Sequence, residues 1–86
     1  MVVGEKPASA YTLEIMTHLA KRVKTIRVKA RGSSISKAAQ VCEIVKRLTG
    51  GKIKYEEIQL YSEEIGEPGE EKTIPVIEII ILHMEE

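Results

Sequence analysis

Apolar side chains recur along this chain at spacings that predict two helices. Over residues 9–22 and again over 34–49 they fall three and four positions apart, which is the spacing of one helix face. Ser9 is the predicted N-cap of the first helix, and Gly50-Gly51 ends the second. The apolar faces of the two helices comprise Leu13, Met16, Leu19, Ala20, Val23, Ile35, Ala38, Val41, Cys42, Val45 and Leu48.

Four further segments have the composition and alternation of β-strands. They cover residues 1–3, 25–30, 52–61 and 74–82. In the third segment the alternation changes phase near Glu56-Glu57, which either a β-bulge or a change of buried face would explain. The Glu-rich stretch 62–71 is predicted to be a long hairpin loop, and Pro75 restricts the start of the last strand to an edge or a loop-like position.

The order β-α-β-α-β-β predicts an α+β fold with two layers, in which a four-stranded sheet is packed by two helices. We expect residues 1–86 to form a single domain.

Residues 76–82 are apolar on both faces of the predicted last strand. A two-layer domain leaves one face of its sheet in water, so a second face of this kind needs an additional cover. A chain of 86 residues also buries a limited share of its surface, which favours association. We therefore predict a dimer interface through the last strand and part of the second helix, made by Val76, Ile80, Leu82, Val41 and Val45.

Charge is strongly segregated along the chain although the formal net charge is zero. Residues 1–54 carry 12 Lys or Arg against three Glu, whereas residues 55–86 carry one Lys against ten Glu. A basic half favours polyanionic partners and an acidic half repels them.

The segment K-A-R-G-S-S-I-S-K, residues 29–37, connects the second strand to the second helix. Gly32 can adopt a positive φ or let another backbone approach closely, and Ser33 or Ser34 can cap the helix. The start of a helix attracts anions, and Lys29, Arg31 and Lys37 would surround it with positive charge. This pattern is typical of a surface that holds phosphate. An ordinary strand-to-helix turn with solvated basic side chains is an equally open interpretation.

The sequence gives no support to catalysis or metal binding. It has no Asp, its one cysteine (Cys42) falls inside a predicted helix, and His18 and His83 lack the spacing of a metal pair. We expect no enzyme activity, cofactor or metal. Lys/Glu enrichment without Asn is associated with thermophiles. With no signal-peptide pattern and no long apolar run, we expect a cytoplasmic protein without a membrane partner.

Two blocks, K-A-R-G-S-S-I-S-K-A at 29–38 and C-E-I-V-K-R at 42–47, resemble the Alba family of archaeal chromatin and RNA-binding proteins. G-E-K-P at 4–7, I-K-Y-E-E-I at 53–58 and I-E-I at 77–79 are similar to further family segments in the same order. The resemblance implies the same fold. It also implies a chromosome-associated dimer that binds double-stranded DNA or structured RNA with little sequence preference.

The basic pattern at 29–37 and the resemblance together predict nucleic-acid contacts at particular positions. These are Lys6, Lys29, Arg31, Gly32, Ser33 and Lys37. A salt bridge to the Glu-rich stretch is the structural alternative for Arg31. Three positions depart from the family pattern, because Glu5, Ser33 and the acidic stretch 62–71 stand where basic residues are usual.

An alternative function follows from the acidic stretch. The chain would then be a structural or regulatory interaction subunit, which pairs with a basic relative and has weak nucleic-acid affinity of its own. The sequence leaves homodimer and heterodimer open.

Overall fold

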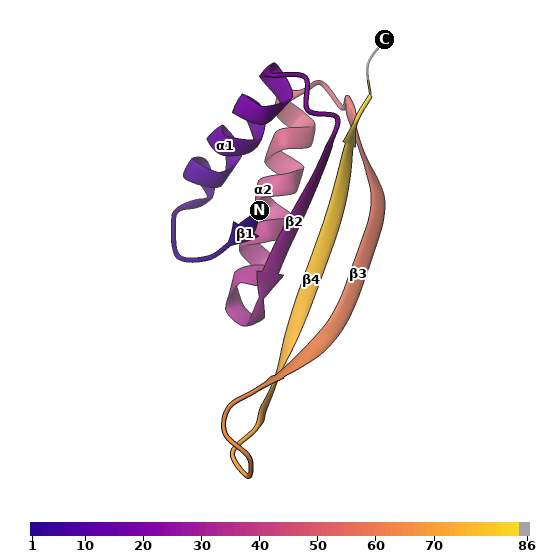
Figure 1. Cartoon of the computed structure of the whole chain (residues 1–86). Helices are drawn as coiled ribbons and strands as arrows, with labels where there is room; N and C mark the ends of the chain where they lie inside the picture. Colours follow the sequence, from indigo (N-terminus) through magenta and orange to yellow (C-terminus); the bar gives the residue numbers. More distant parts are fainter. Residues whose placement is uncertain (85–86) are drawn as a thin grey trace.

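A sheet and a pair of helices form two layers in the computed structural model, which describes residues 1–84 (Figure 1). The elements are β1 (Val2–Val3), α1 (Ala8–Ala20), β2 (Thr25–Arg31), a 3₁₀ turn (Gly32–Ser34), α2 (Ile35–Leu48), β3 (Ile53–Ile65) and β4 (Lys72–His83). The strand order is β1-β2-β4-β3, with β1 parallel to β2 and the other pairs antiparallel. The predicted α+β fold and element order are confirmed.

Both helices pack on the same face of the sheet and enclose the core. From α1 the core receives Tyr11, Ile15 and Leu19, and from α2 it receives Ala38, Val41, Cys42 and Val45. The predicted apolar faces are wrong at four positions, since Ala20 and Val23 are exposed, Leu13 is 69% exposed and Leu48 is 58% exposed.

The error at Leu13 has a geometric cause. A helix turns by about 100° per residue, so Leu13 lies roughly 200° around the axis from the fully buried Ile15. The N-cap of α1 also differs from the prediction. It is Pro7 and not Ser9, and no side chain caps the helix.

A β-bulge in β3 corrects the phase of its apolar side chains. Tyr55 pairs with Ile81 and Glu57 pairs with Ile80, so the register shifts at Glu56. The shift places Ile53, Tyr55, Ile58 and Leu60 on the same face of the sheet, the one that carries the helices. The bulge that the sequence left open is therefore present.

The hairpin loop is shorter than predicted, because β3 and β4 continue pairing beyond the rest of the sheet. Residues 62–65 pair with residues 72–75, and the turn itself covers only residues 66–71. The last pair between β2 and β4 is Arg31 with Val76, so the two-stranded ribbon projects alone as an arm (Figure 1). Pro75 lies in this arm, where β4 has a partner on one side only, as the edge-like position predicted.

The second apolar face of β4 is partly covered within the chain. Val76 is fully buried, and its neighbours across the two ladders are Arg31 and Tyr61, whose long side chains can cover it. Ile80 and Leu82 on the same face are half-buried. The predicted dimer interface needs a correction here, because Val76 and the core residues Val41 and Val45 offer no surface to a partner.

Candidate nucleic-acid interface

The loop between β1 and α1, residues 4–7, is fastened at both of its ends by side chains of the helices. The amides of Gly4 and Lys6 donate to the Tyr11 hydroxyl oxygen at 2.8 and 3.3 Å. Lys37 Nζ on α2 donates to the carbonyl oxygens of Gly4 and Lys6 at 2.7 and 2.8 Å. The loop is thus held against the first turns of α2.

Lys6 is exposed on this fastened loop, and its Nζ lies 5.9 Å from the centre of the Tyr11 ring. Lys37 is half-buried, and two of its three N–H donors are used by the loop carbonyls. Lys37 therefore positions the loop and adds its charge at the same place, whereas Lys6 projects a cation into solvent.

The start of α2 differs from the expected capped turn. Gly32 has a φ of +53°, which confirms its predicted left-handed conformation. Gly32, Ser33 and Ser34 form the 3₁₀ turn, and the amide of Ile35 donates to the Gly32 carbonyl oxygen. Ser34 is the N-cap residue but adopts a helical conformation and makes no side-chain capping bond. The 3₁₀ turn takes the place of the predicted serine cap.

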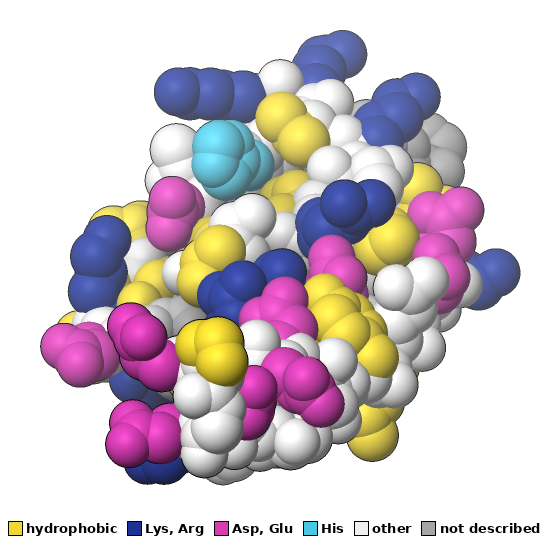
Figure 2. Space-filling view, turned by 60° about the horizontal axis from the view of Figure 1, so that its bottom comes forward, with side chains coloured by type: hydrophobic (Ala, Val, Ile, Leu, Met, Phe, Trp, Pro, Cys, Tyr) yellow, Lys and Arg dark blue, Asp and Glu magenta, His cyan; other side chains and the backbone are white. Residues whose placement is uncertain are grey.

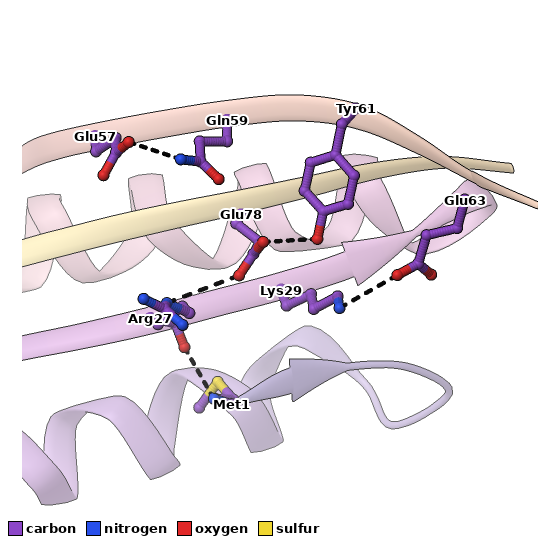
Figure 3. Close-up of polar contacts among 8 residues, drawn as sticks. All are labelled: Met1, Arg27, Lys29, Glu57, Gln59, Tyr61, Glu63 and Glu78. Atoms are coloured by element: carbon purple, nitrogen blue, oxygen red, sulfur yellow. Dashed lines mark hydrogen bonds and ion pairs between the residues drawn. The ribbon is translucent and has the colours of Figure 1, made fainter.

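Arg31 and Lys29 both contact Glu63, which belongs to the projecting arm. Arg31 Nε donates to Glu63 Oε1 at 2.6 Å, and Lys29 Nζ lies 3.5 Å from Glu63 Oε2 (Figure 3 shows the contact with Lys29). The hydrogen bond from Arg31 lowers the pKa of Glu63, and the same contact raises the pKa of Arg31. The salt bridge named as the alternative for Arg31 is the arrangement in this structure.

A second carboxylate on the helix-free face was not found from the sequence. Glu78 Oε1 lies 3.7 Å from Arg27 Nε, and the Tyr61 hydroxyl donates to Glu78 Oε2 at 2.6 Å (Figure 3). This hydrogen bond raises the pKa of Tyr61. Arg27 has the same strand parity as Lys29 and Arg31, so all three side chains point to the same face of β2. This parity is the signal by which the sequence could have indicated Arg27 as a further cation on this face.

The helix side of β3 carries an apolar groove of about 160 Å³, bounded by α2 and β4. Ala39, Ile58 and Ile77 line it, and Tyr55 donates a hydrogen bond to Glu43 at its side. Burial, assisted by this bond, raises the pKa of Tyr55. The thiol of Cys42 at the groove wall is buried, which raises its pKa to about 11.

Residues 1–84 contain no group of three or more His, Cys or Glu side chains placed to hold a metal ion. Neither helix in this part of the chain combines the length and apolar character needed to cross a membrane.

The fold and the fastened loop define a small two-layer α+β protein whose loop beside the second helix carries Lys6 next to Glu5. A sequence model of the Alba family matches residues 1–62. The chain belongs to the Alba family.

Curated relatives and solved structures are similar over most of the chain. The DNA/RNA-binding protein Alba of Pyrobaculum neutrophilum is 34% identical over 83 residues, which cover 94% of this chain and 90% of the relative. That of Nanoarchaeum equitans is 34% identical over 80 residues, covering 90% and 89%. The structure of Alba from Thermoplasma volcanium superimposes with a TM-score of 0.89 at 35% identity, and the match covers 96% of this chain and 98% of that one.

The ion pair of Glu63 predicts a measurable shift in its titration. Its pKa is lowered in the folded chain, so the pair stabilises the fold above the ordinary Glu pKa of 4.5 and is lost as the pH falls through the lowered value. In Arg31→Ala the pKa of Glu63 should rise toward its ordinary value. Carbon-detected NMR titration of the side-chain carboxyls measures it, with Glu64 as the internal control. An unchanged Glu63 pKa in the variant would contradict the pairing.

Proposed function

We propose that this chain binds double-stranded nucleic acid, either DNA or RNA, as a non-enzymatic protein with little sequence preference. The observation that carries the proposal is the fastened loop 4–7, which presents Lys6 beside the start of α2. The relatives named DNA/RNA-binding protein Alba support it. In this proposal residues 1–86 act as one domain.

Lys6, Lys37 and Arg31 are the proposed phosphate contacts, with Lys29 in support and Gly32 and Ser33 at the helix start. Val3 pairs with Ala30, so Gly4 is level with Arg31 and the loop adjoins the end of β2. Contacts of lysine and arginine with phosphate position a protein on a duplex but do not read bases. Low sequence preference follows from this set of residues.

Glu63 competes with phosphate for two of these cations. Its carboxylate already occupies Arg31 and Lys29, so a phosphate group must displace it or share the guanidinium. A carboxylate facing phosphate at 4 Å opposes binding by about 1 kcal/mol in water and by more near a protein surface. We therefore propose that binding at this end is weaker than in a chain with a basic arm.

The second candidate function is an interaction subunit that pairs with a basic relative. The arm favours it, because Glu64, Glu67, Glu70 and Glu71 form no ion pair within residues 1–84. All four carboxylates are exposed, and they remain available to a cationic protein surface or tail.

We propose that the chain is a dimer whose interface covers the apolar groove and the neighbouring β3 residues. Ile58 is 56% exposed and Leu60 is 72% exposed, although both point to the helix side of the sheet. The helices leave this part of β3 uncovered. A second copy can cover it by a twofold arrangement, in which each chain presents the same patch to the other. This location replaces the predicted contacts of Val41, Val45 and Val76.

Loss of Lys6 tests the nucleic-acid contact. Lys6→Ala should weaken binding to unrelated duplexes by similar factors, and it should reduce the slope of log K against log salt by about 0.9, the value of one lost phosphate contact on DNA. Fluorescence anisotropy with DNA and RNA duplexes of several sequences measures both quantities. Binding equal to that of the parent at all salt concentrations would exclude Lys6 as a contact.

The competition between Glu63 and phosphate is tested by comparing a substitution of Glu63 with the same substitution of Glu64. Glu63→Gln should tighten duplex binding several-fold at low salt by releasing Arg31 and Lys29, and the gain should shrink as salt screens the charges. Glu64→Gln is the matched control, because it removes the same charge next to Glu63 but on the opposite face of the arm. Equal gains from the two variants would mean that general repulsion acts, and not the ion pair.

The dimer is tested with two leucines of similar exposure. Leu60→Gln should convert the dimer to a monomer with little effect on the stability of the single chain, because the side chain is 72% exposed there. Leu13→Gln on α1 is the control, with a side chain that is 69% exposed and far from the groove. Sedimentation equilibrium at tens of micromolar distinguishes them. A parent that is monomeric under these conditions would refute the dimer.

A further inference from the structure

Within residues 1–84, cations without an ion-pair partner gather at the end of the molecule opposite the arm. Both helices end there, β2 and β3 begin there, and β4 ends between them (Figure 1). The carbonyl oxygen of Lys24 accepts a hydrogen bond from the His83 amide at 2.7 Å, and that of Lys52 accepts one from the Met84 amide at 2.8 Å. We define the basic end as Lys21, Arg22, Lys24, Lys52 and Lys54.

All five side chains of the basic end are exposed, and within residues 1–84 none of them forms an ion pair or a side-chain hydrogen bond. The opposite end is different, because Arg31 and Lys29 are paired with Glu63. In Figure 2, which views the arm end-on, most carboxylates lie in the lower half and several Lys and Arg side chains project along the upper edge. Two glutamates, residues 85 and 86, follow in the sequence and are fewer than these five cations.

Arg22 has a left-handed backbone conformation, for which glycine is the usual residue. At the end of α1 the Arg22 amide donates to the Leu19 carbonyl and the Val23 amide to the His18 carbonyl, which is a Schellman motif with Arg22 at φ +65°. The same position at the end of α2 is Gly50, at φ +67°. A side chain is strained in this conformation, so folding alone does not explain an arginine there.

The helix dipole accounts for only part of the basic end. Cations stabilise the carboxyl end of a helix, but the effect is confined to its last turn. Lys21 and Arg22 directly follow α1 and fit this explanation. Lys24, Lys52 and Lys54 lie beyond the helix ends, next to or within the strands, and need another explanation.

We propose that the basic end binds the phosphate backbone of nucleic acid, as a contact surface separate from Lys6 and Arg31. The inference rests on the proposed function and names a second surface for it. The molecule is 52 Å long, and the two surfaces are separated along its length. Unpaired exposed ammonium groups release counterions when they meet phosphate, which is the main source of sequence-independent affinity. Lys24 and Lys52 flank β4 and are therefore about two strand spacings, roughly 10 Å, apart.

Two triple variants with equal loss of charge test the inference. The basic-end variant carries Arg22→Gly, Lys24→Gln and Lys52→Gln. Glycine suits the left-handed backbone at position 22, so this variant should fold at least as well there. The loop-end variant carries Lys6→Gln, Lys29→Gln and Arg31→Gln. Binding of a 25-base-pair DNA duplex and an RNA duplex of the same length is measured between 50 and 200 mM salt.

We expect the basic-end variant to lose about tenfold or more in affinity at 50 mM salt, and its salt slope to fall by up to about 2.7, or 0.9 for each lost contact with DNA. The loop-end variant should lose less, because two of its three cations already contact Glu63. Parent-like binding by the basic-end variant, or a larger loss in the loop-end variant, would overturn the inference.

Two further outcomes, failure of the proposed function and self-association of the chain, can be distinguished from the results above. A parent that binds neither duplex at 50 mM salt would overturn the proposed function, and the inference with it. Light scattering without nucleic acid tests whether the basic end instead binds the acidic arm of another copy of the chain. If the parent associates beyond a dimer at low salt and the basic-end variant does not, the basic end holds the acidic arm of another copy, which would also overturn the inference.

Discussion

The pairing of β4 with β2 on one side and β3 on the other determines the electrostatics of this protein. It places the acidic second half of the sequence directly across from cations of the first half, with Glu78 opposite Lys29 in the ladder and Glu63 within reach of Arg31. The opposite charges of the two halves therefore meet on the helix-free face of the sheet. Further cations and carboxylates without an ion pair within residues 1–84 lie where this pairing stops. Along the arm β4 no longer pairs with β2. At the basic end the termini of β2, β3 and β4 lie next to the carboxyl ends of the two helices.

Much of the fold follows from the periodicity of the sequence. The helices, the order of elements and the bulge at Glu56 all depend on local spacing, which the sequence displays directly. The arm does not, because Gly66, Pro68, Gly69 and many glutamates give residues 62–71 the composition of a loop. Cross-strand hydrogen bonds nevertheless extend both strands to residues 65 and 72. Periodicity also cannot separate core from interface, and for that reason Val41 and Val45 were assigned to a partner that their full burial excludes.

The sequence motif identified the candidate site but not the state of its side chains. Arg31 and Glu63 are separated by 32 positions, so the sequence could offer a salt bridge to the Glu-rich stretch only as an alternative to phosphate contact and could not name the carboxylate. The contacts of Lys37 are likewise not visible in the local sequence. A basic residue near a helix start is typical of an anion contact, yet its Nζ donates to two carbonyl oxygens and holds the loop that presents Lys6. The motif locates positive charge, whereas tertiary contacts decide how much of it a phosphate can use.

Under the proposed function, the ion pair of Glu63 modulates phosphate binding and does not block it, because the pair is weak. Salt bridges on a protein surface contribute about 0–1 kcal/mol, because water and dissolved ions screen the charges and the side chains lose mobility. Arg31 is exposed enough to exchange one oxyanion for another at that modest cost. A duplex offers many phosphates at once, and each can replace the carboxylate as the chain moves along the backbone. Under the proposed function, an acidic arm of this kind lowers affinity and flattens its dependence on salt, because fewer cations exchange counterions for phosphate. The fold and the fastened loop stay as they are.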